Sequence, residues 1–232
     1  MTDNSETNKA RLLAAILPHV AFDGWSGASF AAAADEAGLS LEKARAIAPR
    51  GAIDLAIAFH REGDAAMVER LALADLSEMR FRDKVATALR YRVEATTDKE
   101  AVRRASTLFS LPVHAPDGAR LLWETADHVW TALGDTSRDG NWYSKRATLS
   151  GVWAATVLYW LGDDSADHAE TMAFIDRRID DVMKFEKLKA ELRKNPLTKP
   201  LMSLQSSLFE KLRAPDPTAL DNLPGRWKGP IS

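Results

Sequence analysis

The fold is decided by the stretch "ASFAAAADEAGLSLEKARAIAPRG", residues 28–51 of a chain of 232 residues. Alanine, leucine and glutamate dominate it, and these residues are strong helix formers. Gly38 interrupts the run, and Ser40 follows at a position where a serine caps a new helix. Pro49 and Gly51 end this second helix, which we place at 41–48. Two short helices joined by a glycine-containing turn indicate a helix-turn-helix unit.

Helical periodicity dominates the chain on both sides of this unit, and strand-like alternation is absent. We predict further helices at 7–22, 52–79, 81–95, 98–110, 117–134, 141–161, 165–193 and 198–213, an all-α fold of about ten helices. Three short helices before a larger helical body resemble the TetR-type regulator fold, whose members usually dimerise. The expected organisation is a flexible N-terminus (1–10), a helix-turn-helix-like head (11–50), a helical body (51–195), an amphipathic helix (196–213) and a disordered tail (214–232).

The composition excludes several kinds of site. The chain has no cysteine, so it has no disulfide framework, thiolate metal site or cysteine nucleophile. The net charge of −2 gives the whole molecule no strong attraction to nucleic acid. No window reaches eighteen apolar residues, and the polar start "MTDNSETNKA" is neither a signal peptide nor an arginine-rich transit peptide. We therefore expect a soluble, cytoplasmic protein.

The second helix of the unit is a poor reader of DNA. It offers Glu42, Lys43 and Arg45 and is otherwise alanine, leucine and isoleucine. Base edges are read by Arg, Asn, Gln or Ser side chains, supported by basic contacts to phosphate. The preceding helix carries Asp35 and Glu36 and no base, and these charges repel phosphate. We predict no nucleic-acid partner, and keep a TetR-type, ligand-responsive transcriptional regulator as the alternative function.

No catalytic arrangement is visible. The five histidines are His19, His60, His114, His128 and His168, and none has HExxH or paired spacing. The segment "GWSGAS" at 24–29 lacks the preceding strand that a GxSxG nucleophile requires. We predict a protein with no catalytic residue and no metal, while an enzyme with a site that sequence patterns do not reveal stays open.

The segment "ADHVWTALGDTSRDGNWYSKRATLSGVWAATVLY" (126–159) is the most distinctive part of the chain. It resembles the COQ9 family of ubiquinone (coenzyme Q) biosynthesis accessory proteins. The residues that carry the resemblance are Asp127, Trp130, Gly134, Asp135, Asn141, Trp142, Tyr143, Lys145, Arg146, Leu149 and Gly151. The head segment "AFDGWSGASFAAAADEAGLS" and the segment "FIDRRIDDVMKFEK" are also similar to that family, so the resemblance spans roughly residues 11–209.

The resemblance implies a TetR-like fold without DNA binding. It implies a lipid-binding protein that is not an enzyme and has no cofactor beyond a bound lipid or isoprenoid quinone precursor. Its partners would be phospholipid, polyprenyl quinone intermediates, a di-iron hydroxylase of the demethoxyubiquinone type, and a second copy in a homodimer. It would lie at the inner membrane as a peripheral protein, on the matrix side in the mitochondria of eukaryotic relatives.

The adjacent pair Trp142 and Tyr143 opens the helix at 141–161. Neighbouring helical residues point about 100° apart, so a single neighbour cannot bury both. Trp and Tyr are frequent interface anchors, although Trp142 could instead pack against its own helix start. The resemblance implies a partner-binding surface at these positions: Asp127, Val129, Trp130, Trp142, Tyr143 and Arg146. A larger apolar residue than Val129 is expected at its position.

An apolar face follows on the same helix at the spacing of a buried surface. Its residues are Leu149, Val152, Trp153, Thr156, Val157 and Trp160. An isoprenoid tail needs a pocket with such a lining, and methionine suits an adaptable wall. We name as lipid-binding candidates Trp153, Val157, Trp160, Met172, Ile175 and Ile179. Filled core is the alternative interpretation of the same pattern.

The predicted last helix, "PLTKPLMSLQSSLFEKLRAP", is amphipathic. Residues 184–213 hold eight Lys/Arg against three Asp/Glu, a local charge of +5. An apolar stripe within basic surroundings fits interfacial binding to anionic lipid. We predict that the membrane contacts are Leu201, Met202, Leu204, Leu208, Phe209 and Leu212. The alternative is that this helix folds back on the body or pairs with a second subunit.

Overall fold

The protein is described by a computed structural model, which covers residues 2–96 and 98–194. Within those ranges it is all-α, as predicted, with nine α-helices and a short 3₁₀ helix (Ala166–His168) before the last. The helices are α1 (Thr2–Asp23), α2 (Gly27–Glu36), α3 (Leu41–Ile47), α4 (Ala52–Leu73), α5 (Phe81–Glu94), α6 (Lys99–Ser110), α7 (Ala115–Ala132), α8 (Gly140–Leu161) and α9 (Ala169–Lys194).

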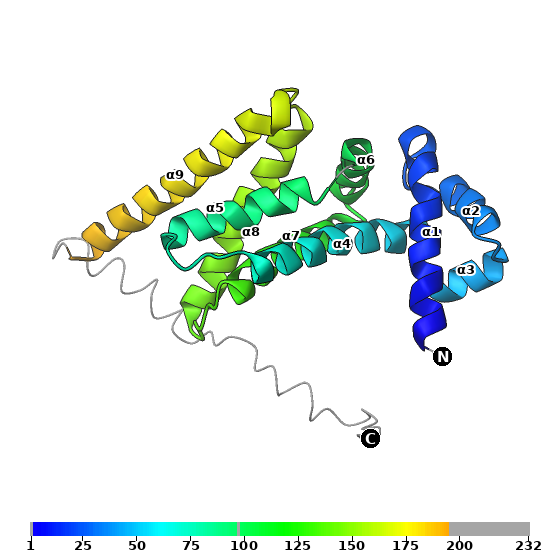
Figure 1. Cartoon of the computed structure of the whole chain (residues 1–232), viewed down its shortest axis with the longest axis horizontal. Helices are drawn as coiled ribbons and strands as arrows, with labels where there is room; N and C mark the ends of the chain where they lie inside the picture. Colours follow the sequence, from blue (N-terminus) through cyan, green and yellow to red (C-terminus); the bar gives the residue numbers. More distant parts are fainter. Residues whose placement is uncertain (1, 97, 195–232) are drawn as a thin grey trace, which may run out of the picture.

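Helices α1, α2 and α3 form the head, at one end of the molecule (Figure 1). Leu12 and Ile16 of α1 are buried with Phe30 of α2 in one apolar cluster. Burial of each such side chain stabilises the head by about 1.5–3 kcal/mol. Residues 2–10, expected to be flexible, are helical and extend α1.

The turn between α2 and α3 has the predicted helix-turn-helix chemistry. Gly38 adopts a φ of +64°, in the left-handed region that favours glycine. The amide of Leu39 reaches back to the carbonyl of Ala34 at 2.9 Å, which closes α2. The side chain of Ser40 accepts a hydrogen bond from the Lys43 amide and so caps α3.

Helices α4 to α9 form the body, and α4 connects it to the head (Figure 1). A second apolar cluster joins Met67 of α4, Leu89 of α5, Val129 of α7, Trp153 of α8 and Ile175 of α9. Helix α8 packs between α7 and α9, and α9 also packs on α5. The functional surfaces described below are built on this body.

Two of the predicted helix boundaries that differ from the structure have a clear local cause. Helix α4 ends at Leu73 rather than 79, because the carboxylate of Asp75 accepts hydrogen bonds from the amide and hydroxyl of Ser77 and stabilises a turn. The regular helix predicted from 165 begins at Ala169, after the 3₁₀ helix. There the buried carboxylate of Asp163 accepts from Thr171, whose amide and hydroxyl both donate.

Candidate functional site

An apolar cavity of about 370 Å³ lies in the body. Helices α4, α5, α6, α7 and α8 all contribute to its wall. Leu158 lines it and is 69% exposed, so the cavity reaches the molecular surface at this residue. Both the volume and the apolar lining are typical of small-molecule sites, which occupy about 300–1,000 Å³.

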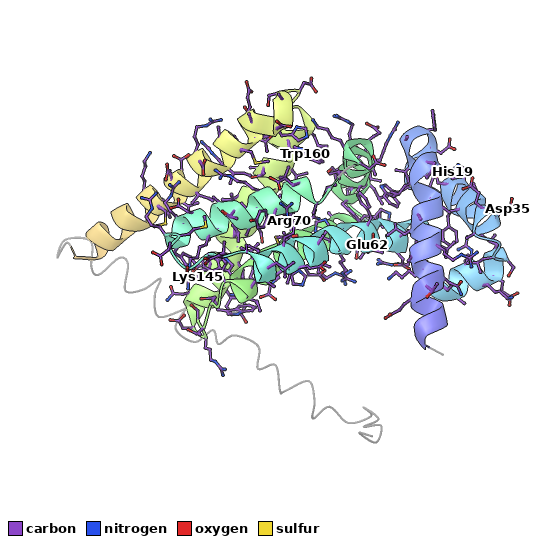
Figure 2. The ribbon with its side chains drawn as sticks, viewed as in Figure 1. His19, Asp35, Glu62, Arg70, Lys145 and Trp160 are labelled. Carbon is purple, nitrogen blue, oxygen red and sulfur yellow. The ribbon has the colours of Figure 1, made fainter. Side chains whose placement is uncertain are left out.

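Helix α8 supplies one wall of the cavity. Trp153, Val157 and Trp160, predicted from the sequence to bind lipid, all line it; Trp160 lies near the C-terminal end of α8 (Figure 2). Trp153 and Trp160 are almost completely buried. The same face of α8 therefore serves both as core and as cavity wall.

The opposite wall comes from α6 and not from α9. Met172, Ile175 and Ile179 pack in the apolar core of the body and are absent from the cavity lining. The reason is topological: α9 packs against α5 and α8, whereas α6 packs against α7 and α8. A lipid contact of these three residues stays a prediction from the sequence.

Sequence reasoning missed the wall that α6 builds. Val102, Ala105 and Phe109 line the cavity and lie at i, i+3 and i+7 on this helix. That spacing is a usable signal for a buried face. Close contact of α6 with α7 depends on Gly118, because a Cβ atom at this position would lie 2.9 Å from Cβ of Phe109.

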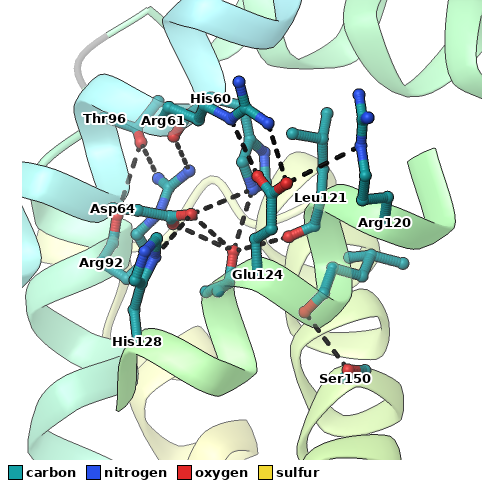
Figure 3. A network of polar contacts seen from close by, with 12 residues as sticks. His60, Arg61, Asp64, Arg92, Thr96, Arg120, Leu121, Glu124, His128 and Ser150 are labelled. Carbon is teal, nitrogen blue, oxygen red and sulfur yellow. Dashed lines mark hydrogen bonds and ion pairs between the residues drawn. The ribbon is translucent and has the colours of Figure 1, made fainter. Parts of the chain in front are cut away.

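A buried polar network borders the cavity (Figure 3). Asp64 accepts from Nε of Arg92 at 2.6 Å, and both side chains are at least 95% buried. Thr125 donates to the same carboxylate and lies 2.9 Å from Nε2 of His60. Arg92 also donates to Oγ1 of Thr96 and to the carbonyl of His60. Of these residues, His60, Arg92 and Thr96 line the cavity.

The buried network contains one ion pair, between Arg92 and Asp64, and one neutral imidazole, that of His60. Burial lowers the pKa of His60 to about 4, despite the nearby carboxylate of Asp64. Burial opposes ionisation of Asp64, but His128, Arg92 and His60 outweigh it and lower the pKa of that carboxyl. Asp64 in turn raises the pKa of His128, whose Nδ1 lies 3.5 Å from the carboxylate. At neutral pH, Arg92 is therefore balanced by Asp64 and His60 is uncharged.

A second feature is an aromatic patch formed by Trp123 of α7 with Trp142 and Tyr143 of α8. The ring centroids of Trp142 and Tyr143 are 4.7 Å apart in an edge-to-face arrangement, and Trp123 contacts both rings. All three residues are half-buried. Such rigid, partly exposed aromatic groups are typical of protein interfaces. The surface predicted from the sequence lacks Trp123, which lies on α7 about one turn before Asp127.

Arg146 packs against the buried side of this aromatic patch. Its guanidinium lies 4.0 Å from the ring centre of Trp142 and donates to the carboxylates of Asp127 and Asp135. Burial opposes ionisation of Asp135, but hydrogen bonds from Lys145, Ser137 and Arg146 lower its pKa to about 2. The Arg146 side chain is only 3% exposed, so it orients the patch rather than forming its outer face.

The other predicted partner-binding residues are spread over α7. Val129 is completely buried in the body core and offers no surface for a partner. Trp130 stacks on Phe81 of α5, with Nζ of Lys145 5.1 Å from its ring centre. Asp127 is half-exposed and binds Arg146. The structure thus brings together Asp127, Trp142, Tyr143 and Arg146, while Trp130 contacts a different helix.

Some predictions concern residues outside the described part of the chain. The predicted membrane contacts are among them: Leu201, Met202, Leu204, Leu208, Phe209 and Leu212. Across the described ranges, no helix has the length and apolarity needed to cross a bilayer. In the same ranges, no cluster of three or more His, Asp or Glu residues could hold a metal ion.

The fold and the cavity define a TetR-like, all-α protein with a ligand-sized hollow in its body. A TetR transcriptional regulator from Nitrosomonas europaea ATCC 19718 has a similar structure, with a TM-score of 0.60 over 74% of this chain and 95% of that one. The sequence identity is 16%, so the likeness concerns the fold alone.

Sequence comparison is more specific. The COQ9 family model matches residues 115–186. "Ubiquinone biosynthesis protein COQ9, mitochondrial" of Rattus norvegicus is 31% identical over 192 residues, which are 78% of this chain and 60% of that protein. The Homo sapiens protein of the same name is 29% identical over 78% of this chain and 59% of its own length. The chain is similar to the COQ9 family over these residues, and it spans about three fifths of the length of these relatives.

Proposed function

We propose that this protein is a lipid-binding accessory protein of ubiquinone biosynthesis. It holds a polyprenylated quinone precursor in the α6–α8 cavity at the membrane and presents it to a partner di-iron hydroxylase. The observation that carries this proposal is the apolar cavity of about 370 Å³, whose walls from α7 and α8 lie in the region that matches the family. Relatives named for ubiquinone biosynthesis support the choice of ligand.

Helix α8 links the two surfaces that this function needs. Its first turn carries Trp142 and Tyr143, and its centre carries Trp153, which lines the cavity. Ten residues of α-helix span about 15 Å. A partner bound to the aromatic patch would therefore lie about 15 Å from the cavity wall at Trp153, on the same helix.

A polyprenylated ligand leaves the bilayer readily only if another apolar environment takes the place of the lipid. Each buried CH₂ group of an isoprenoid tail contributes about 0.8 kcal/mol to its preference for an apolar site. A lined cavity offers that environment away from the bilayer. The basic, amphipathic segment at 196–213 supplies the membrane contact in this proposal, with anionic phospholipid as its target.

The test is mass spectrometry of lipids extracted from gently purified protein. We expect enrichment of polyprenyl phenols or quinones over the bulk lipid of the host. The cavity-filling variant Ala105→Leu should lose most of this material, because the added side chain occupies the wall opposite α8. Ala147→Leu adds the same volume at an exposed position of the same helix bundle and should retain the lipid. Folded wild-type protein without enriched isoprenoid lipid would contradict the proposal.

Presentation to a hydroxylase is tested separately. We expect Trp142→Ala to abolish capture of a demethoxyubiquinone hydroxylase-type enzyme while the bound lipid is unchanged. Leu73→Ala, at an 82% exposed apolar residue of α4, is the control for general loss of surface apolarity. Equal loss of capture in both variants would remove the aromatic patch from the proposed function.

A transcriptional regulator is the second candidate, because the similar Nitrosomonas europaea structure is a TetR regulator. The head has the helix-turn-helix geometry, but α3 presents only Lys43 and Arg45 as cations, next to Glu42. A gel-shift titration with genomic fragments at moderate salt discriminates the two functions. Sequence-specific retardation at nanomolar protein would favour the regulator.

A further inference from the structure

We infer that α6 is the gate of the cavity. Its carboxyl half, residues 105–110, swings away from α7, while its amino half, residues 99–104, stays fixed to the rest of the fold and acts as the pivot. This inference rests on the proposed function and adds how a ligand enters and leaves, which the shape of the closed cavity does not specify.

The amino half of α6 is held at the ends of two other helices. Arg103 donates to the carbonyl of Leu161 at 3.0 Å, at the last residue of α8. Arg104 donates to the carbonyl of Ala21 at 3.0 Å, in the last turn of α1. The last carbonyls of a helix have no partner within that helix, and cations are favoured beside them. Both arginines therefore fix this half of α6 to α8 and α1.

Two further hydrogen bonds hold the first turn of α6. Nζ of Lys99 donates to the carbonyl of Asp163 at 2.5 Å, just beyond α8. The buried indole of Trp25 in the head donates to the carbonyl of Ala101 at 3.1 Å. Within α6, which the structure describes completely, Ala101 alone is buried. The fixed and buried part of this helix is thus its amino half.

The carboxyl half of α6 has a different kind of contact. Across the described ranges, residues 105–110 form no hydrogen bond or ion pair with another helix, and Thr107 and Ser110 donate only to carbonyls of α6 itself. Ala105, Leu108 and Phe109 are partly buried against the apolar cluster of the head. Apolar packing is not directional, so this half can shift without breaking a hydrogen bond.

The turn that follows α6 also leaves the helix end free to move. Leu111 is 48% exposed and Val113 is 75% exposed. The backbone hydrogen bonds of the turn are local, such as that from the His114 amide to the carbonyl of Leu111 at 2.9 Å. Movement of this turn would therefore cost little buried apolar surface.

The closed position depends on a close contact between α6 and α7. A Cβ atom at Gly118 would lie 2.9 Å from Cβ and 3.3 Å from the carbonyl oxygen of Phe109. The two backbones thus approach as closely as a glycine permits. Ala105, Phe109 and Ser110 line the cavity. Separation of α6 from α7 at this contact would therefore open the wall that lies opposite α8.

The first experiment locks this contact in the full chain. The chain has no cysteine, so Phe109→Cys with Gly118→Cys allows one disulfide, whose Cβ atoms lie about 3.5–4.5 Å apart. Stopped-flow fluorescence measures exchange of N-phenyl-1-naphthylamine, an uncharged apolar fluorophore. Because a gate slows entry and exit alike, we expect the oxidised variant to bind and release the probe about tenfold more slowly than the reduced variant, with an equal dissociation constant.

The second experiment wedges the same contact open. The methyl group of Gly118→Ala would push Phe109 away from α7, and we expect about threefold faster exchange of the probe. Gly151→Ala is the matched control, since a Cβ there meets no atom within 4 Å, and it should exchange the probe like wild type. Equal rates in the oxidised and reduced double-cysteine variant would overturn the inference, as would exchange that Gly118→Ala leaves unchanged.

Failure of the gate can be told apart from failure of the proposed function. If folded wild-type protein does not bind the probe, or if Ala105→Leu binds it equally well, the cavity takes no apolar ligand and both ideas fall. If the probe binds in the cavity and the disulfide does not slow its exchange, the carrier function survives and the gate is wrong.

Discussion

At position 63, the packing of Arg92 against α4 leaves no room for a side chain larger than the hydrogen atom of glycine. A Cβ there would lie 2.4 Å from one terminal guanidinium nitrogen of Arg92, which crosses α4 at this point. We expect Gly63→Ala to displace Arg92 from Asp64 and to lower the free energy of unfolding by about 1–3 kcal/mol, as overpacking does. Urea denaturation followed by circular dichroism measures this.

Gly151 is the matched control for this substitution. It lies within α8, and a Cβ would meet no atom within 4 Å. Gly151→Ala should stabilise the protein by up to about 1 kcal/mol through helix propensity. If both variants gained stability, the close approach of Arg92 to α4 would be disproved.

His60 should make the protein sensitive to mild acid. Its folded-state pKa of about 4 lies below the ordinary 6.5, so the unfolded state binds more protons between those values. Stability therefore falls as pH drops from 6.5 to 4, by roughly 3 kcal/mol, since one pKa unit corresponds to about 1.4 kcal/mol. We expect His60→Gln to flatten this part of the stability–pH curve.

Neighbouring groups act in other pH ranges and provide internal controls. The lowered pKa of Asp64 gives stability that is lost only as pH falls below the ordinary carboxyl value of 3.8. The raised pKa of His128 gives stability below 6.5 that is lost as pH rises through its folded-state value. An unchanged slope between pH 6.5 and 4 in the His60→Gln variant would show that another group causes it.

At the scale of elements, Arg146 joins α8 to α7 and to the loop between them. Its guanidinium binds Asp127 of α7 and Asp135 of the loop, and the Asp135 side chain is 4% exposed. Arg146→Ala would leave that carboxylate without its second cation, and we expect a loss of about 3 kcal/mol in unfolding free energy. Trp142 would also lose its cation–π contact.

Arg61 and Glu124 make a comparable two-point ion pair between α4 and α7, at 2.8 Å. The Arg61 side chain is 46% exposed, so Arg61→Ala should cost less than about 1 kcal/mol. Thermal or urea unfolding compares the two variants directly. Similar losses would mean that burial does not decide the strength of the α7–α8 pair.

The helices with a clear periodic pattern could be predicted from the sequence, but the helices that pack against them could not. The apolar face of α8 is buried as expected, with Leu149, Trp153 and Trp160 in or beside the core. The cavity wall opposite it comes from α6, although the sequence pattern also suits Met172 and Ile175 of α9, which we predicted there. Periodicity identifies a buried face, but it does not say which helix lies against it.

At the scale of the whole molecule, we predict that the segment beyond the described residues carries membrane binding. In the full chain, Leu204→Glu with Leu208→Glu should weaken binding to anionic vesicles more than a hundredfold, because the charges also interrupt the apolar stripe. Ser203→Glu with Ser207→Glu adds the same charge on polar positions and should weaken binding only by the charge effect, about 1 kcal/mol per charge or roughly thirtyfold for two charges. Vesicle co-sedimentation measures both.

Equal weakening by the two pairs would show that net charge alone controls vesicle binding. In that case an apolar stripe that enters the bilayer would be contradicted. Retention of cavity lipid in both variants is the check that the body is intact.

The all-α class, the helix-turn-helix head and the similarity to the COQ9 family follow from the amino-acid sequence alone. Local chemistry encodes these features: Gly38 and Ser40 specify their turn, and the 126–159 segment carries a distinctive residue pattern. Three further facts needed the folded chain: α6 faces α8 across a cavity, Trp123 completes the aromatic patch, and Val129 is buried. The physical reason is that these facts depend on contacts between different helices, and such contacts are fixed by packing of the whole body.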